Sequence, residues 1–350
     1  MLRDTSRVVE IPHMLQIEAG AIGRVPEILD AYDLLGSHIT VVAGSGGTRD
    51  LALSLIGALN RRHIACNLES LKGYDLRTAK QLRVRLIDGP ADVAVAMGGG
   101  GILDVAKVAA SGVMPLINVP TALSHDGVCS PVASLHDSSG VRQSVGTAMP
   151  RGVIIDPEAV LETAPLSLTA GLGDLLSNLS AVEDWRLAAV KTGEVFDEYA
   201  ANIAEASALG ALQITDLRTI RSAAALARGL VMSGLAMAVA GSSRPCSGAE
   251  HLISHALDQL LGAKALPHGH QVALGTAVMA ELQGKCVNVL LAAFQRCGVP
   301  YRPSELGLTV GQVAEAISLA PSMRPGRYTL LSELEAGGER VRRAIEKATR

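Results

Sequence analysis

The stretch Asp92-Val-Ala-Val-Ala-Met-Gly-Gly-Gly-Gly-Ile-Leu-Asp-Val-Ala-Lys-Val-Ala-Ala110 decides the fold of the N-terminal half of this chain. It begins as a short apolar run, passes four consecutive glycines at Gly98–Gly101, and continues as the apolar segment Ile102–Ala110. This order predicts a buried strand, a tight loop and a helix. Because glycines carry no Cβ, the backbone N–H groups of such a loop and of the first helical turn can face a phosphate group.

Two neighbouring segments repeat this pattern. The run Thr40–Ala43 enters the glycine-rich turn Gly44-Ser-Gly-Gly-Thr-Arg-Asp50 and the helical pattern Leu51–Asn60, and the run Pro115–Pro120 ends in Thr121-Ala-Leu-Ser-His-Asp-Gly127. Continuous apolar strands that alternate with helices predict a parallel sheet covered on both faces. Ligands of such sheets bind at the carboxyl ends of the strands, so three successive strand ends of this kind favour a nucleotide site over a purely structural turn.

The pattern changes after residue 130. The runs Pro131–Leu135 and Val141–Val145, joined at the turn Asp137-Ser-Ser-Gly140, predict a hairpin, and Gly152–Ile155 predicts a further strand. From about Thr163 onward the chain consists of Ala-, Leu- and Ile-rich segments that end at glycine or proline.

We therefore predict two domains in this chain. Residues 1–162 form an α/β nucleotide-binding domain with a Rossmann-like parallel sheet, and residues 163–350 form an all-α domain. A chain of 350 residues is long enough for two hydrophobic cores. With 48% hydrophobic but only 2% aromatic residues, those cores consist of Ala, Leu, Val and Ile.

Charge and hydropathy exclude several classes of protein. The net charge of −3, without any run of Lys or Arg, argues against nucleic-acid binding. Met1–Arg7 is followed by no apolar stretch and so predicts no signal peptide, and the apolar segment Gly229–Gly241 is too short to span a bilayer. We expect a cytoplasmic protein that does not bind membranes.

The cysteines agree with a reducing compartment. Five are present, an odd number without C-x-x-C spacing, which argues against a disulfide framework and a zinc ribbon: Cys66, Cys129, Cys246, Cys286 and Cys297. We expect most of them to be small buried hydrophobic residues.

Histidines gather in one short region. Four of the nine lie between residues 251 and 270: His251, His255, His268 and His270. His251 and His255 are one helical turn apart, and His268 comes from a loop before a second apolar helix. With Asp174 they provide the ligand types of zinc or another first-row divalent ion. Glu250 precedes His251, so this is not the H-E-x-x-H of metalloproteases. A buried structural histidine and an N-capping role for Asp174 remain alternatives.

Together, the chain's motifs resemble those of sn-glycerol-1-phosphate dehydrogenases, within the superfamily of iron-containing alcohol dehydrogenases, glycerol dehydrogenases and dehydroquinate synthases. The motifs are Gly98-Gly-Gly100 with Asp104 and Lys107, Thr121-x-x-Ser-His-Asp-Gly127, Gly173-Asp-x-x-Ser-Asn178 with Glu183-Asp-Trp185, Gly241-Ser-Ser-Arg-Pro245 with Ser247-Gly-x-Glu-His251, Ser254-His-Ala-Leu-Asp258, His268-Gly269 and Arg324-Pro-x-Arg-Tyr-Thr329. They cover nearly the whole chain in the family's order. The resemblance implies a dehydroquinate synthase-like fold, with metal and substrate between the two domains.

The resemblance also implies the metal ligands. These are Asp174, His251 and His268, which would hold one divalent ion: zinc first, or nickel or ferrous iron. A fourth histidine, found in some iron-containing alcohol dehydrogenases four residues after the aspartate, is Asn178 here. Three protein ligands would leave one open face for a substrate.

For the cofactor, the resemblance places the pyrophosphate at three glycines and further residues on the nicotinamide side: Gly98, Gly99, Gly100, Asp104, Lys107, Thr121 and Ser124. NAD-specific enzymes usually place a carboxylate against the adenosine 2′-hydroxyl. After the first predicted strand, Gly44–Thr48 offers none before Asp50, so we expect NADPH to be accepted at least as well as NADH.

The implied reaction is the reduction of a phosphorylated ketone, dihydroxyacetone phosphate. Asp126 would lie close to this substrate. His255 is the candidate proton donor or relay, with orientation of a metal ligand as the alternative. Arg244 is a candidate for the substrate phosphate. By family expectation the protein is a homodimer or larger homo-oligomer.

Two departures from the family pattern bear on function. Gly269-His270-Gln271 stands where Gly-Glu-Gln is usual, and the loop after Asp126 carries Cys129 and Val132. These differences leave open a dehydrogenase for another phosphorylated or polyol ketone, including one of secondary metabolism. A dehydroquinate synthase-like cyclase and a non-catalytic nucleotide-binding protein are further alternatives, which the glycine loop and the complete set of ligand positions disfavour.

Overall fold

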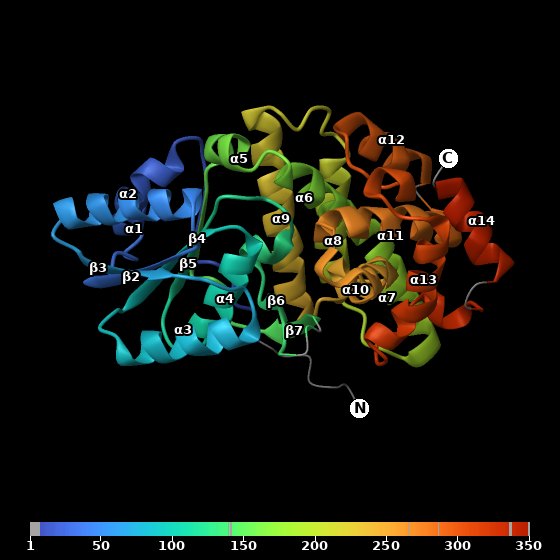
Figure 1. Cartoon of the computed structure of the whole chain (residues 1–350), viewed down its shortest axis with the longest axis horizontal. Helices are drawn as coiled ribbons and strands as arrows, with labels where there is room; N and C mark the ends of the chain where they lie inside the picture. The colour runs from blue at the N-terminus through green and yellow to red at the C-terminus, as the bar shows by residue number, and fades with distance from the viewer. Residues whose placement is uncertain are drawn as a thin grey trace.

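A six-stranded parallel sheet forms the centre of the N-terminal half in the computed structural model (Figure 1). The structure describes residues 8–138, 140, 142–264, 266–285, 287–335 and 338–348. The strands are β1 (Met14–Ile17), β2 (His38–Ala43), β3 (Ala65–Ser70), β4 (Val93–Gly98), β5 (Leu116–Pro120) and β8 (Gly152–Ile155). Their order is β1-β8-β5-β4-β2-β3, so the chain reverses direction across the sheet between β2 and β4. Ligands of open α/β sheets bind at the carboxyl ends of such a strand pair.

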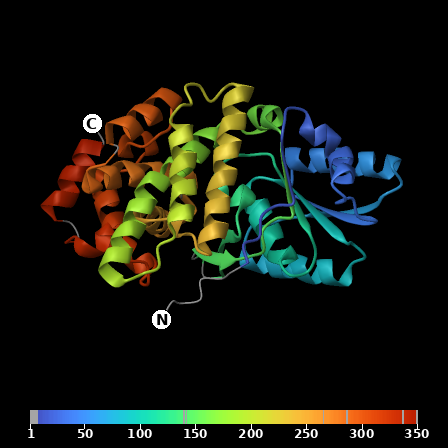
Figure 2. The ribbon, with the colours of Figure 1, turned by 180° about the vertical axis from the view of Figure 1, so that it is seen from behind.

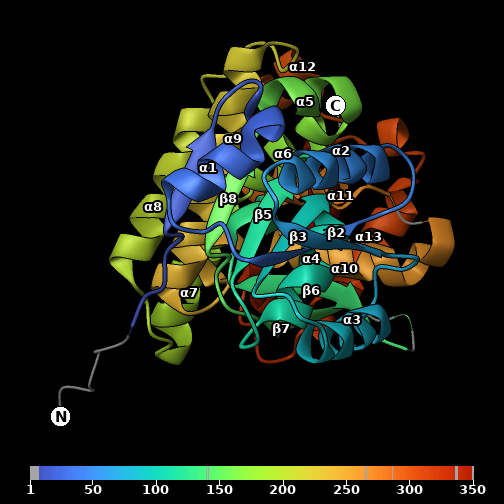
Figure 3. The same ribbon diagram turned by 90° about the vertical axis from the view of Figure 1, so that its left-hand side faces the viewer.

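Helices cover both faces of this sheet (Figure 3). They are α1 (Val25–Ala31), α2 (Gly47–Arg61), α3 (Leu76–Asp88) and α4 (Gly100–Ala110). Alternate residues of one strand serve opposite faces: Val41 packs in the cluster under α1 and α2, and Val42 packs in the cluster with α3 and α4. The predicted parallel sheet is thus confirmed. The sequence pattern did not predict β1 and β3, which lie at the two edges and lack a continuous buried run.

The hairpin that follows the sheet consists of β6 (Val132–His136) and β7 (Arg142–Gly146), paired antiparallel in a separate two-stranded sheet. Both strands begin one residue later than predicted, and Ser139 and Val141 of the predicted turn and strand lie outside the described residues. The hairpin packs against α4, which places it between the sheet and the helical half (Figure 1).

From Pro157 onward, the described residues form helices and no strand. The α-helices are α5 (Pro157–Thr163), α6 (Ser167–Leu176), α7 (Asn178–Thr192), α8 (Glu198–Ala211), α9 (Ile220–Ala240), α10 (Ala249–Leu261), α11 (His268–Gln283), α12 (Val287–Cys297), α13 (Val310–Met323) and α14 (Glu339–Ala348). Short 3-10 helices are η1 (Ala21–Arg24), η2 (Asp126–Cys129), η3 (Arg244–Cys246), η4 (Gly262–Lys264), η5 (Pro303–Leu306) and η6 (Leu330–Glu333). We keep residues 1–162 and 163–350 as the proposed domains; this boundary falls within α5.

Helix α9 lies where the two halves meet (Figures 1 and 2). It packs against α5, α6, α8 and the short helix η2. By length and composition it could cross a membrane, but more than half of its most apolar window is buried inside the protein, as in a core helix. The sequence pattern showed only its second half because Arg221 and Arg228 interrupt the apolar run. Residues 121–131 connect β5 to β6 and are called the substrate-side loop below, because the predicted substrate contact Asp126 lies in them. Gly234 lets α9 approach this loop, since a Cβ there would lie 1.8 Å from the Cys129 carbonyl oxygen.

The cysteines agree only in part with the expectation that most are buried. Cys129 and Cys246 are buried, whereas Cys66 and Cys297 are half-buried, and all four are free thiols. Cys286 and Met1–Arg7 lie outside the described residues.

Candidate metal and cofactor site

A cavity of about 390 Å³ opens between the loops at the carboxyl end of the sheet and the helical half. The hairpin closes one of its sides through Val132, Ser134 and Arg142. Its lining includes the candidate ligands Asp174, His251 and His268, together with Gly101, Asp104, Asp126 and His255.

Asp174, His251 and His268 form a compact cluster in this cavity. One possible ligand atom from each lies within 4.8 Å of the other two. Asp174 Oδ1 is 3.4 Å from His251 Nε2 and 3.8 Å from His268 Nε2. One carboxylate and two imidazoles so arranged fit a first-row divalent ion with an open coordination position toward the cavity.

Close packing of α6 against α11 brings Asp174 and His268 together. A Cβ on Gly173 would lie 2.4 Å from the Gly269 carbonyl oxygen, and a Cβ on Gly269 would lie 2.0 Å from that of Ala170. Only glycine therefore permits this approach, and each glycine is adjacent to a candidate ligand. Asp174 lies inside α6 near its end, so the alternative of an N-cap is wrong.

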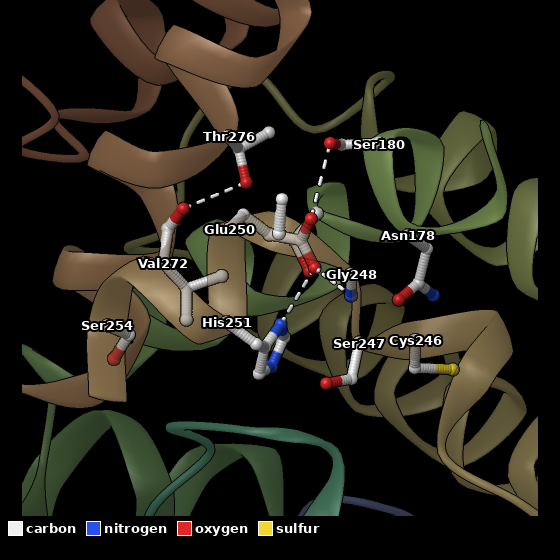
Figure 4. Close-up of polar contacts among 12 residues, drawn as sticks. Asn178, Ser180, Cys246, Ser247, Gly248, Glu250, His251, Ser254, Val272 and Thr276 are labelled. Carbon is white, nitrogen blue, oxygen red and sulfur yellow. Dashed lines mark hydrogen bonds and ion pairs between the residues drawn. The ribbon is translucent and has the colours of Figure 1, made fainter. Parts of the chain in front are cut away.

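Glu250 orients His251 (Figure 4). Its side chain is fully buried and contacts the backbone N–H of Gly248, the Ser180 hydroxyl and, at 3.0 Å, His251 Nδ1. A carboxylate can only accept here, so Nδ1 carries a proton and Nε2 is the nitrogen that a metal ion would bind.

A chain of hydrogen bonds orients His268 in the same way. Ser254 Oγ lies 2.9 Å from His268 Nδ1 and donates to Gln271 Oε1 at 3.0 Å. Because the hydroxyl proton is used toward Gln271, Oγ accepts from Nδ1–H and leaves His268 Nε2 unprotonated. Gln271 in turn donates to Asp258 Oδ1 at 2.9 Å. In both candidate ligands, the hydrogen bond at Nδ1 therefore leaves Nε2 directed toward the candidate metal position.

The electrostatics of the cluster favour a bound cation. Burial lowers the pKa of His251, but hydrogen bonds to Asp174 and Glu250 outweigh it and raise the pKa to about 10. Burial and the charge of Asp174 raise the pKa of Asp126 to about 7. These buried carboxylates thus draw positive charge toward the position that a divalent ion would occupy.

Asp126 connects the substrate-side loop to helices α6 and α9. Its backbone N–H donates to Asp174 Oδ2 at 3.0 Å, and its carboxylate Oδ2 accepts from the Ser233 hydroxyl at 2.8 Å. One oxygen of Asp174 is therefore held by the loop while the other faces the two imidazoles.

His255 lines the cavity beside His268, with ring centroids 6.1 Å apart. Its Nδ1 is buried and has no hydrogen-bond partner among the described residues. Burial and then the charges of His251 and Arg142 lower its pKa to about 3. A neutral imidazole can relay a proton only if one ring nitrogen accepts a proton while the other releases one. The role of His255 as a proton relay stays a prediction.

The glycine loop shows which of its members leave room for a ligand. A Cβ on Gly98 would lie 2.2 Å from Ile102 Cδ1, and one on Gly100 would lie 2.0 Å from His125 Nε2. At Gly99 the nearest atom would be Ala122 Cβ at 3.8 Å. Internal packing therefore explains Gly98 and Gly100, whereas Gly99 faces space into which a phosphate could come.

Lys107 is fully buried and is not among the residues that line the cavity. Asp104, one turn earlier in α4, does line the cavity. Lys107 Nζ donates to the carbonyl oxygens of Gly127 and Val132 and lies 2.9 Å from Asp104 Oδ1. Asp104 Oδ2 accepts the backbone N–H of Ser134 at 3.0 Å. Both residues thus tie α4 to the substrate-side loop and the hairpin, and their contact with a cofactor stays a prediction.

Thr121 and Ser124 follow β5 in the same loop. Thr121 is buried, and its backbone N–H donates to the Gly98 carbonyl at 3.0 Å. Ser124 is half-buried. The structure therefore places Thr121 beside the glycine loop, while neither residue is among those lining the cavity.

Two residues singled out in the sequence are not among those that line the cavity. Arg244 is buried, binds the Glu194 carboxylate through Nε and Nη2, and donates to the Tyr328 carbonyl at 2.8 Å. It is not among the residues that line the cavity, so it is not positioned to bind a substrate phosphate. His270 is also not among them: its Nε2 lies 2.9 Å from the Thr169 hydroxyl on α6. The change at His270 therefore affects the α6–α11 contact directly.

Asn178, at the position of the family's occasional fourth histidine, is held away from the metal cluster. Its amide nitrogen lies within hydrogen-bond distance of the Ala204 carbonyl oxygen and of the hydroxyls of Ser207 and Ser233, and its two hydrogens are shared among them. Of the two unusual loop residues, Val132 lines the cavity and Cys129 is buried.

The orienting residues Glu250, Ser254 and Gln271 were not predicted as functional. All three lie in or beside motifs quoted from the sequence, and Glu250 directly precedes a candidate ligand. That adjacency was the available signal, but the partner of each side chain follows only from the folded chain.

The chain is similar to known dehydrogenases over nearly its full length. Residues 16–165 match the family model of iron-containing alcohol dehydrogenase. The glycerol-1-phosphate dehydrogenase [NAD(P)+] of Thermococcus kodakarensis is 36% identical, with 98% of this chain and 97% of that protein covered. The corresponding protein of Archaeoglobus fulgidus is 35% identical, with 97% and 98% covered.

Solved structures share the fold. A probable glycerol dehydrogenase from Sinorhizobium meliloti superposes with a TM-score of 0.76 at 20% identity, covering 98% of both chains. The NADH-dependent butanol dehydrogenase A of Thermotoga maritima gives a TM-score of 0.71 at 15% identity and covers 99% of both chains. These similarities confirm the predicted fold of an α/β sheet domain followed by a helical region.

Proposed function

Since this chain belongs to the family of NAD(P)-dependent glycerol-1-phosphate dehydrogenases, we propose that it reduces dihydroxyacetone phosphate to sn-glycerol 1-phosphate. The observation that carries the proposal is the cluster of Asp174, His251 and His268, open to a cavity beside the glycine loop. The nearly full-length similarity to proteins of that name supports the choice of substrate.

We propose that Asp174, His251 and His268 hold one divalent ion, zinc first, with nickel or ferrous iron as alternatives. Such an ion supplies Lewis-acid polarisation of a ketone oxygen when bound. Glu250 and Ser254 keep the two imidazoles in the tautomer that leaves Nε2 available.

The remaining roles belong to the cofactor and the substrate. NADPH or NADH would lie along Gly98, Gly99 and Gly100, where the sheet reverses its strand order. Asp126, held between Ser233 and Asp174, would accept a hydrogen bond from a substrate hydroxyl. His255, which lines the cavity, would donate or relay the proton that the reduction of the ketone requires. We propose a homodimer or larger homo-oligomer, acting in the cytoplasm without a membrane or nucleic-acid partner.

The test is oxidation of NADPH and NADH with dihydroxyacetone phosphate, followed by chiral analysis of the product. We expect activity that EDTA removes and added metal restores, with sn-glycerol 1-phosphate as the product. We also expect kcat/KM with NADPH at least equal to that with NADH, because Gly44–Thr48 carries no carboxylate. Absence of turnover in every metal state would exclude this substrate. A strong preference for NADH would contradict the cofactor prediction alone.

A further inference from the structure

A permanent cation in the cavity favours binding of a phosphorylated substrate, and Arg142 is the only lysine or arginine among the described residues that line it. Phosphate oxygens are bound best by charge-assisted hydrogen bonds, and a guanidinium can donate two of them in parallel. The cavity's histidines do not replace it. His251 and His268 are candidate metal ligands, and a single imidazole cannot offer two parallel donors as a guanidinium does.

The other buried cations of this region are already engaged by the protein. Arg244 binds Glu194, and Lys107 binds Asp104 together with backbone carbonyls. Arg327 donates to the Ser243 hydroxyl and the Ser247 carbonyl. Ser243 and Ser247 line the cavity but Arg327 does not, so these two residues separate its guanidinium from a ligand in the cavity.

Arg142 retains donors that face no protein partner. Its Nε donates to Asp258 Oδ2 at 2.9 Å, and its Nη1 makes only a long contact of 3.4 Å to the Ser134 hydroxyl. Its Nη2 donates no hydrogen bond within the described residues. The side chain is 22% exposed, so a ligand in the cavity can reach it.

Asp258 fixes the direction of this guanidinium. Arg142 comes from β7 of the N-terminal half and Asp258 from α10 of the helical half, so their ion pair crosses the cleft. Asp258 also accepts from Gln271, which is linked through Ser254 to the candidate ligand His268. Arg142 is thus placed relative to the candidate ligand His268 by four successive hydrogen bonds.

A second donor lies on the same wall. His255 Nδ1 is buried, lines the cavity and has no partner among the described residues. Arg142 and His255 both line this cavity. A phosphate between the two would receive hydrogen bonds from the guanidinium and from the neutral imidazole N–H.

We propose that Arg142 binds the phosphate group of the substrate and so determines the enzyme's preference for phosphorylated over unphosphorylated ketones. This assignment rests on the proposed function. It replaces Arg244, the candidate drawn from the sequence.

The kinetic test compares dihydroxyacetone phosphate with dihydroxyacetone in Arg142→Gln, Arg142→Lys and the wild type. Arg142→Gln is expected to lower kcat/KM for the phosphorylated ketone about 10- to 100-fold, mainly through KM, because a charge-assisted pair is lost. The loss for dihydroxyacetone should be much smaller, and Arg142→Lys should fall between. Arg218→Gln, at an exposed arginine paired with Asp216, is the control and should match the wild type.

Equal losses for both ketones in Arg142→Gln would overturn the proposal. So would an unchanged preference together with a raised KM for NADPH, because Arg142 would then bind a cofactor phosphate. Thermal unfolding of each variant monitors folding, and Arg142→Lys keeps the charge next to Asp258 if Arg142→Gln is unstable.

A binding measurement separates this proposal from the proposed function. Calorimetric titration of the metal-loaded protein with inorganic phosphate needs no turnover. We expect binding at least 10-fold weaker in Arg142→Gln than in the wild type and largely retained in Arg142→Lys. Equal affinity in the wild type and Arg142→Gln, or no binding by either, would overturn the site even if the reductase activity is confirmed.

Discussion

Replacement of Lys107 by methionine should destabilise the protein strongly, because the ammonium group is buried with its counter-ion. Lys107 is 1% exposed, and its Nζ lies 2.9 Å from Asp104 Oδ1. Methionine fills a similar volume but leaves Asp104 buried without a cation. Removal of one partner of a buried ion pair costs about 3–5 kcal/mol. At about 2–4 °C per kcal/mol for a domain of this size, Tm should fall by roughly 6–20 °C.

The assay is urea unfolding followed by circular dichroism, with thermal unfolding as a second measurement. Lys285→Met is the matched control, because Lys285 is 57% exposed and pairs with Glu183, so its loss should cost less than about 1 kcal/mol. Adding Asp104→Asn to Lys107→Met should restore part of the stability, since the orphaned charge is removed while the contact with Ser134 can persist.

The same variant also tests the role predicted for Lys107 from the sequence. If Lys107→Met unfolds within about 1 kcal/mol of the wild type and instead raises the KM for NADPH and NADH, the structural explanation is refuted. Lys107 would then act on the cofactor.

Three further predictions concern the metal cluster and the glycine loop. His251→Ala should abolish stoichiometric metal binding, measured by elemental analysis, whereas the exposed His13→Ala should not; metal retained by His251→Ala would contradict the ligand set. Glu250→Gln should weaken metal affinity about 10- to 100-fold in a chelator competition, because a neutral amide supports the His251 imidazole less well; unchanged affinity would show that Glu250 serves only packing. Gly99→Ala should keep the wild-type Tm but weaken NADPH and NADH binding in a fluorescence titration. Gly100→Ala should instead cost about 1–3 kcal/mol of stability, because its Cβ would clash with His125. Unchanged cofactor binding by Gly99→Ala would place the cofactor elsewhere.

The sheet could be predicted where its strands are buried on both faces. β4 and β5 form continuous apolar runs and were recognised within one residue of their observed bounds. The edge strand β3 escaped because its residues are half-buried or exposed and carry no such run. Helix α9 was recognised only in part for a related reason, since Arg228 interrupts an apolar pattern whose burial depends on neighbouring helices.

The candidate ligands could be named from the sequence because family motifs fix their chemical type and order. Their orienting partners could not: Glu250 is adjacent to His251 in sequence, but its side chain is held by Ser180, 70 residues away. Arg244 shows that a distant contact can also rule out a role suggested by the sequence. Its motif suggested an anion-binding role, but Glu194, 50 residues away in the chain, already neutralises it.

Contacts across the cleft make the metal cluster and the substrate-side loop parts of one structural unit. Asp174 offers Oδ1 to the imidazoles and Oδ2 to the backbone N–H of Asp126, so the same carboxylate positions the candidate metal and the loop. Arg142 and Asp258 bridge the cleft again from the hairpin. A change in the angle between the two halves would therefore disturb metal geometry and phosphate position together. Removal of either the Asp174–Asp126 contact or the Arg142–Asp258 ion pair should therefore change substrate affinity and metal affinity in the same direction. Such coupled changes require contact between the two halves.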